Sequence, residues 1–465
     1  MHRTKPIFQS SFIVILILLS VLSIKANFVG TNSPDIKALN FVPTESGAFD
    51  FKIWLSNYNY SNPATSLVVN SDGTITQTNL GSGSIRANTA SLSNSNTAYY
   101  LTTTKEVWKT MDGGNSFQQL TSFPAPSQGT ATDIFASSFD PARVWVVINN
   151  GDMSSQCNDG SAWVRVYRSF NGGQTWTYSE VVDPNDYCLR EVYRGDAYGN
   201  VVYIGGVGQG VGGHWDGVIY VSNDGGITWQ RDWSHNELTG PNASSAISSF
   251  ATPKLGSSAG NVWYATVERR SITFPSAAPY LRGILRKQGG TWSYKALEGC
   301  TGCFSGTDKV KVVDIAVDTW EPNLVMVLVE GHGLYRSTTG GDSWTRILAD
   351  TTTDNSWRIE PDPTMSGHFW LAGKINGTEG LYRTTECGIG AWTQVYAGNV
   401  VGNSGTFRQP RWRWYLLPLI LIGKIAMEMD CWIDGNCLAM TMTMIVRLMW
   451  ICQRWAQIHC TRIFS

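Results

Sequence analysis

Charged side chains are scarce in this sequence. Asp, Glu, Lys and Arg make up 15% of its 465 residues, against roughly 25% in an average soluble protein. The formal net charge is −1, so no excess of positive charge attracts the chain to nucleic acid or to an anionic membrane. The polar surface must therefore come from Ser, Thr, Asn and Gly, a composition that favours a turn-rich, all-β extracellular protein over a helical one.

A long apolar run is also lacking. The segment from Phe12 to Ile24 is too short to span a bilayer, which takes about 20 residues. A positive start precedes it and the small residue Ala26 follows, the pattern of a secretory signal. We therefore expect residues 1–26 to be removed, no membrane span to remain, and the mature chain to begin near Asn27; an uncleaved anchor is the alternative. Three glycosylation sequons agree with a secretory route: Asn59, Asn242 and Asn376.

One phrase recurs along the chain. We call this repeated eight-residue motif the box. It begins with a hydroxyl residue, followed by any residue and then by Asp or a substitute. Gly-Gly, two further residues and an aromatic residue complete it. Its clear copies contain Thr110, Asp112, Gly114 and Phe117; Ser169, Asn171, Gly173 and Trp176; Ser222, Asp224, Gly226 and Trp229; Ser337, Gly341 and Trp344. A stretched copy runs from Thr384 to Trp392, and a worn copy ends at Trp292.

The box residues predict a hairpin turn. Asp-Gly and Asn-Gly between two β runs favour tight turns because glycine adopts positive φ without penalty. The hydroxyl and carboxylate groups can bond to the backbone of the turn, and the aromatic residue leads the next strand into the core. Strand–turn–strand patterns precede the boxes, so that units begin near residues 39, 91, 138, 196, 248, 312 and 358. Four short strands at this period predict one β-propeller of seven blades within residues 27–400.

The boxes resemble the Asp-box, or bacterial neuraminidase, repeat. The wording "GLYRSTTGGDSW" resembles the xyloglucan-hydrolase family and the sortilin ectodomain more than the sialidases. The resemblance implies that each box is a structural turn between the third and fourth strands, away from the ligand. The arginine triad and early motif of sialidases and the Gly-Gly-Ala-Tyr-Arg stretch of xyloglucan hydrolases are missing, and "WRIEP" at Trp357 is the nearest echo. No catalytic residue can therefore be carried over.

Ligand chemistry is expected on the face opposite the boxes, which we call the box-free face. Its connections are long, and loops on a rigid scaffold often carry function. Trp215 is the candidate for stacking on a sugar ring, with His214 beside it, and Arg269 and Arg270 could bind a carboxylate. The weaker catalytic candidates are Asp216, Asp186 and Asp159. The alternative is a solvated turn with Trp215 packed against a neighbour.

Cysteine positions add two expected disulfides. Cys157 and Cys188 fall in connections of the same predicted face, and Cys300 and Cys303 could close a tight loop. Cys387 has no evident partner in the sequence. No cofactor is expected, and no metal site, because no second CxxC accompanies the first.

The amino-acid composition and the repeat pattern of the chain change after residue 400. Within the tail 401–465, the part from Arg411 to Ser465 has only two glycines, Gly423 and Gly435, and contains the run "MTMTMI" from Met440 to Ile445. Read one frame over, this run gives alternating Asp residues, as in oxygen-rich Ca²⁺ loops. The hypothesis is an out-of-frame reading of an acidic extension, and only the restored frame would bind Ca²⁺.

Two classes of function follow. The first is a secreted propeller that binds a polysaccharide, another glycan or an extracellular protein through its box-free face. The second is a glycoside hydrolase of the xyloglucan-hydrolase or sialidase-like kind, and the missing motifs favour the first. An assembly factor like the photosystem-building Asp-box propellers has no specific residue in its favour.

Overall fold

The structure is a computed structural model of the full chain. It describes residues 41–43, 51–57, 65–70, 75–80, 84–90, 94, 96–137, 140–149, 164–181, 188–209, 215–234, 245–254, 257–269, 283–297, 312–349, 357–362 and 366–397. The predicted signal segment and the tail from residue 401 lie outside these ranges. No described helix is long and apolar enough to cross a bilayer.

The described strands pair into seven antiparallel sheets of four strands each, numbered 1 to 7 in chain order. Sheets 1 to 3 comprise β1 (Phe41–Pro43), β2 (Phe51–Asn57), β3 (Thr65–Asn70), β4 (Ile75–Asn79); β5 (Ile85–Ala90), β6 (Ala98–Thr102), β7 (Val107–Thr110), β8 (Gln118–Gln119); β9 (Thr130–Ala136), β10 (Val144–Asn149), β11 (Val164–Ser169), β12 (Thr177–Glu180). Sheets 4 and 5 comprise β13 (Cys188–Tyr198), β14 (Val201–Gln209), β15 (Trp215–Ser222), β16 (Gln230–Ser234); β17 (Ser245–Ala251), β18 (Trp263–Arg269), β19 (Gly283–Gln288), β20 (Thr291–Ala296). Sheets 6 and 7 comprise β21 (Val312–Val317), β22 (Val325–Val329), β23 (Gly333–Ser337), β24 (Thr345–Leu348); β25 (Arg358–Pro361), β26 (Phe369–Ile375), β27 (Thr378–Thr384), β28 (Thr393–Ala397).

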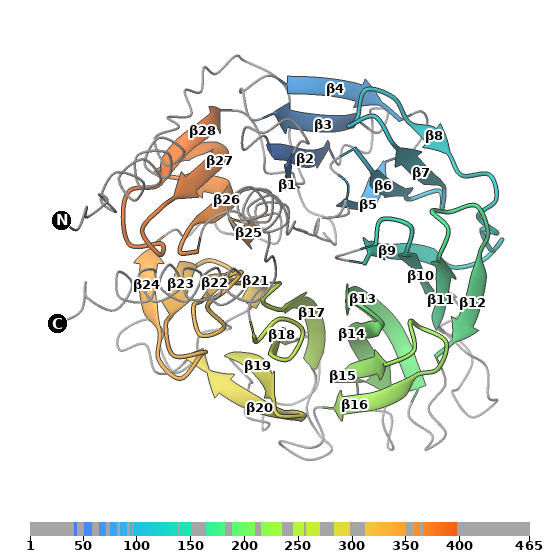
Figure 1. Ribbon diagram of the computed structural model, residues 1–465. Helices are drawn as coiled ribbons and strands as arrows, with labels where there is room; N and C mark the ends of the chain where they lie inside the picture. The colour runs from blue at the N-terminus through green and yellow to red at the C-terminus, as the bar shows by residue number, and fades with distance from the viewer. Residues whose placement is uncertain are drawn as a thin grey trace, which may run out of the picture.

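The sheets follow one another around a common axis, with the first strand of each nearest the centre and the fourth at the rim (Figure 1). This arrangement confirms the predicted class, an all-β propeller of four-stranded blades. Three predicted unit boundaries were wrong. Sheets 2, 3 and 4 begin at Ile85, Thr130 and Cys188, ahead of the predicted residues 91, 138 and 196.

The inner strands explain those errors, because both of their faces are covered. All residues of β9 but the first are buried, and so are all but one of β5. A strand buried on both faces shows no alternation of polar and apolar residues. The pairing register of β5, β9, β13, β17 and β21 with the second strand also shifts locally, as at a β-bulge, and a shift of this kind breaks the period of two.

Each clear box connects the third strand of a sheet to the fourth, as predicted. In sheet 4 the Ser222 hydroxyl accepts a hydrogen bond from the Gly226 N–H at 2.7 Å and donates to Asp224 Oδ1 at 2.6 Å. Asp224 Oδ1 also accepts the N–H groups of Ile227 and Thr228, both at 2.9 Å. Gly225 and Gly226 have φ of 80° and 90°, a conformation that favours glycine.

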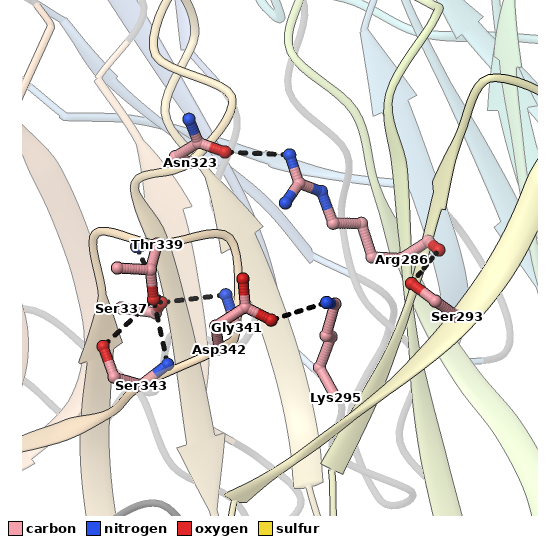
Figure 2. A network of polar contacts seen from close by, with 9 residues as sticks. All are labelled: Arg286, Ser293, Lys295, Asn323, Ser337, Thr339, Gly341, Asp342 and Ser343. Carbon is pink, nitrogen blue, oxygen red and sulfur yellow. Dashed lines mark hydrogen bonds and ion pairs between the residues drawn. The ribbon is translucent and has the colours of Figure 1, made fainter.

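The boxes also join neighbouring sheets. Figure 2 shows the box of sheet 6, where Ser337 Oγ accepts the Gly341 N–H and Thr339 Oγ1 accepts the Ser343 N–H. From sheet 5, Lys295 pairs with Asp342 at 2.5 Å, and Arg286 donates to Asn323 Oδ1 at 2.8 Å. Cations of sheets 2 and 3 bond to box carbonyls of the following sheet in the same way: Lys109 to Gly172 and Arg168 to Gly226.

The aromatic residue of the box packs between sheets. Trp344 is 5% exposed and joins a cluster that contains Tyr264 and Ile284 of sheet 5. Trp176 and Trp229 are only partly buried and pack at the edges of the corresponding clusters. The worn copy in sheet 5 forms a two-residue turn, Gly289-Gly290.

Candidate ligand-binding site

The strand order separates two kinds of connection. Antiparallel strands place the first hairpin and the box of every sheet at one end of the ring. The second hairpin and the passage to the next sheet lie at the other end, the box-free face. The second hairpins of sheets 3 and 5 are long, 150–163 and 270–282, whereas those of sheets 4, 6 and 7 are only 210–214, 330–332 and 376–377. Two of the long connections, 235–244 and 270–282, flank the boundary between sheets 4 and 5.

Two of the candidate residues begin a strand rather than lying in a loop. Trp215 and Asp216 are the first residues of β15 and pair with Gln209 and Gly208 of β14. Gly217, the next residue, is a buried strand residue. Its N–H donates to the Ser245 hydroxyl of sheet 5 at 2.9 Å, and a Cβ at this position would lie 2.8 Å from the same oxygen.

Ser245 links this strand end to a second candidate. It begins β17 and pairs with Arg269, the last residue of β18. The fold thus brings the start of β15 and the end of β18 together at the box-free face, across the boundary between sheets 4 and 5. The sequence predicted the shared face but not this contact through Ser245.

Glycines in β14 make this boundary compact. A Cβ at Gly206 would collide with the Glu191 carbonyl of β13, and one at Gly205 would lie 2.6 Å from Ile247. The irregular register of β13 places its backbone over Gly206, where no side chain fits. The run "IGGVGQ" therefore sets the spacing of the strands that carry the site.

Several predicted residues lie outside the described ranges. They are His214, Arg270, Asp159, Asp186, Cys157, Cys300, Cys303, Asn59 and Asn242. Cys188 is the first residue of β13, and its pairing with Cys157 stays a prediction. Cys387 is disulfide-bonded, although the sequence offered no evident partner for it.

Sequence reasoning missed a set of polar residues on the inner strands, which we call the inner girdle. It consists of Asp133, Arg194, Ser249, Asp314 and Arg358, one from each of sheets 3 to 7, and all five are buried. Asp133 pairs with Arg194 at 3.3 Å and accepts the Gly195 N–H at 2.9 Å. The girdle therefore connects sheet 3 to sheet 4 beside the axis.

Asp314 makes the corresponding connection among sheets 5 to 7. It accepts the Ser249 hydroxyl of sheet 5 at 3.1 Å and the Ile359 N–H of sheet 7 at 3.0 Å. Burial raises the pKa of Asp314 to about 6, although Arg358 nearby and the Ile359 N–H act to lower it. This carboxyl therefore takes up a proton at a higher pH than it would in water.

A second pair of charges lies next to the girdle. Lys254 contacts Asp196 at 3.1 Å, and both side chains are largely buried. Burial, followed by the charge of Asp314, raises the pKa of Glu360 well above its usual value, with Arg194 and Lys254 acting in the opposite direction. The centre of the ring thus combines four acidic and three basic groups, and burial raises the pKa of the two carboxyls of sheets 6 and 7.

One sequence signal could have revealed the girdle. "TATDIFA" and "VVDIAV" each place an Asp inside an otherwise apolar inner strand, and a buried carboxylate requires partners. Its role in the structure is to connect sheets. Among the described residues, no group of three or more His, Cys, Asp or Glu side chains could hold a metal ion.

No protein-family model and no curated protein matches the chain. Solved structures of similar fold include YCF48 bound to a D1 peptide, at 14% identity and a TM-score of 0.44, with 74% of this chain and 96% of that chain covered. An ancestral GH74 enzyme is 17% identical with a TM-score of 0.49, and the match covers 80% of this chain and 47% of that chain. The GH74 xyloglucanase from Xanthomonas campestris is 15% identical with a TM-score of 0.38, and the match covers 75% of this chain and 43% of that chain. The chain thus spans less than half of each GH74 structure.

Proposed function

We propose that this chain is a secreted Asp-box β-propeller that binds a glycan or an extracellular partner at its box-free face. The observation that carries the proposal is the boundary between sheets 4 and 5, where the start of β15 and the end of β18 meet through Ser245. On the box-free face this boundary is flanked by the connections 235–244 and 270–282. Loops on a rigid scaffold of this kind are suited to recognition.

The residue types at this boundary suit a carbohydrate. A sugar presents an apolar ring face and many hydroxyls, so its site needs an aromatic platform beside polar groups. Trp215 supplies the aromatic ring, Asp216 follows it in β15, and Arg269 ends β18. An arginine at this position would favour an acidic sugar or another carboxylate-bearing ligand.

The Asp-box identity is supported by the box hydrogen bonds. The hydroxyl residue accepts the N–H of the second glycine in sheets 2, 3, 4 and 6, at 3.0, 2.8, 2.7 and 2.8 Å. The same bond at four turns indicates a shared structural motif, and the motif lies at the end of the ring opposite the proposed site. Secretion is supported by the amino-terminal pattern of charge, apolar run and Ala26.

Glycoside hydrolysis is the alternative, in which Asp216 acts with Asp159 or Asp186. Its specific support is the position of Asp216 at the start of β15, on the face where the connections containing the other two carboxylates emerge. Hydrolysis requires two carboxyl groups about 5 to 9.5 Å apart. The two functions therefore share one face and differ in what Asp216 does.

Binding to a panel of plant and microbial polysaccharides tests the proposal. We expect Trp215→Ala to abolish binding without changing the thermal midpoint. The matched control is Tyr178→Ala, which removes an aromatic ring 51% exposed on the outer strand β12 and should leave binding intact. Equal loss in both variants would refute the site, and reducing sugar released by the wild type but not by Asp216→Asn would establish the hydrolase.

A further inference from the structure

The turn between β26 and β27 combines a glycosylation sequon with an open surface. We propose that Asn376 carries an N-linked oligosaccharide, which this turn projects from the box-free face at sheet 7. The inference rests on the secretory part of the proposed function, because the modifying enzyme acts in the secretory pathway. It adds a modification site and its position to that proposal.

The backbone at this turn is suited to an exposed asparagine. Ile375 pairs with Thr378, so Asn376 and Gly377 form a two-residue hairpin loop. Their φ angles are 51° and 80°, the combination that a type I′ turn requires and that Asn-Gly satisfies best. Residues 376 to 378 are all exposed.

Among the described residues, none crowds the glycine of this turn. A Cβ built at Gly377 meets no atom within 4 Å. In the box of sheet 3, by contrast, a Cβ at Gly172 would lie 2.7 Å from Lys109 Nζ of the preceding sheet. The Asn376 turn is therefore one of the positions where a bulky substituent meets no neighbouring sheet.

The Asn376 amide is also chemically available, because within the described part of the chain it makes no hydrogen bond. Asn171 in the box of sheet 3 shows the opposite situation. Its Oδ1 accepts the Thr175 N–H at 2.9 Å and its Nδ2 donates to Thr175 Oγ1 at 2.8 Å. Asn171 is needed by its turn, whereas Asn376 serves its turn through the backbone alone.

The modification is a group transfer from a lipid-linked oligosaccharide. A bond forms between Asn376 Nδ2 and C1 of the first sugar, the bond from C1 to the lipid diphosphate breaks, and one amide proton is released. Thr378 supplies the hydroxyl that completes the acceptor sequence. The oligosaccharide is uncharged or weakly charged and strongly hydrated, so the outer surface of this turn must remain in solvent.

The position of the sequons follows a rule in this fold. Asn59 lies between β2 and β3 and Asn242 between β16 and β17, so both connections belong to the box-free face, as Asn376 does. No connection of the box face contains a sequon. Sheet 7 lies across the ring from sheets 3 and 4 (Figure 1), so an oligosaccharide at Asn376 leaves the long connections accessible.

The test uses the full chain, expressed in eukaryotic cells behind a signal sequence of established cleavage. Secreted protein is treated with peptide-N-glycosidase in ¹⁸O water, which converts a glycosylated Asn to labelled Asp, and the peptide containing residue 376 is analysed by mass spectrometry. We expect labelled Asp at 376. Thr378→Ala should remove one oligosaccharide, and the matched variant Thr378→Ser should retain it.

Unlabelled Asn or Asp at 376 in secreted protein would overturn the inference, the latter indicating deamidation of the Asn-Gly pair. The variant Asn376→Asp guards against misfolding, since Asp also tolerates positive φ. Polysaccharide binding by the same material is a separate readout. Binding without modification rejects only this inference, and modification without binding rejects only the proposed ligand.

Discussion

At the scale of single residues, the box concentrates several bonds on one hydroxyl. Ser222 Oγ is hydrogen-bonded to the Gly226 N–H and to Asp224 Oδ1. The Gly226 N–H is buried, so losing its acceptor would leave an unsatisfied donor. Asn223, between them in sequence, is exposed and takes no part in these bonds.

We expect Ser222→Ala to destabilise the protein by about 1–3 kcal/mol, the usual cost of an unsatisfied buried donor. Asn223→Ala, one position along the same turn, should change stability by less than about 0.5 kcal/mol, as exposed substitutions do. Thermal unfolding of both variants measures the difference. Equal midpoints would mean that the hydroxyl contributes nothing to the turn.

Asp314 and His368 have pKa shifts with opposite effects on stability in the same pH range. Burial raises the pKa of Asp314 to about 6, so its folded form binds a proton more tightly than the unfolded chain does. Burial lowers the pKa of His368 to about 4, with Asp362 opposing and Arg383 adding to the shift. Lowering the pH from 7 to 4 therefore stabilises the fold through Asp314 and destabilises it through His368.

Substitution should separate these contributions. With Asp314→Asn, the stability of the variant should fall more steeply than that of the wild type as the pH drops from 6.5 to 4, because His368 then acts with less opposition. With His368→Gln, stability should rise over the same interval, because Asp314 and Glu360 both take up protons. Thermal midpoints at several pH values give the slopes, and identical slopes in the two variants would contradict both assignments.

At the scale of elements, local chemistry decides what the sequence reveals. The boxes could be predicted because Gly225-Gly226 and their counterparts require positive φ and follow a hydroxyl residue at fixed spacing. The inner strands could not be delimited, since β9 is buried on both faces and its register is interrupted. The contact between Gly217 and Ser245 joins residues of different sheets, and nothing in either segment indicates that partner.

Packing between elements predicts unequal roles for two tryptophans. Trp344 is buried between sheets 5 and 6, so Trp344→Ala should cost about 3–5 kcal/mol. Trp215→Ala, at the start of β15, should leave the thermal midpoint nearly unchanged while weakening ligand binding. If both substitutions destabilise the protein equally, Trp215 is a packing residue and the site lies elsewhere.

At the scale of the whole molecule, the box turns repeat at one end of the ring, whereas the second hairpins at the other end differ in length. Boxes and inner girdle repeat from sheet to sheet and connect neighbours. The second hairpins range from the two residues of sheet 7 to the segment 150–163 of sheet 3, although the flanking strands pair in the same way. Extra length without a structural requirement is expected where a ligand is recognised.

The hairpin of sheet 7 provides a template for testing this asymmetry. Asn149 pairs with Val164 across the 150–163 connection, just as Ile375 pairs with Thr378 across Asn376-Gly377. Replacing residues 150–163 by Asn-Gly should therefore preserve the strand register and, because loop closure entropy changes slowly with length, leave the thermal midpoint the same or higher. Polysaccharide binding should fall at least tenfold if this connection belongs to the site. A variant that folds normally and binds as tightly as the wild type would exclude sheet 3 from the site and confine it to the boundary between sheets 4 and 5.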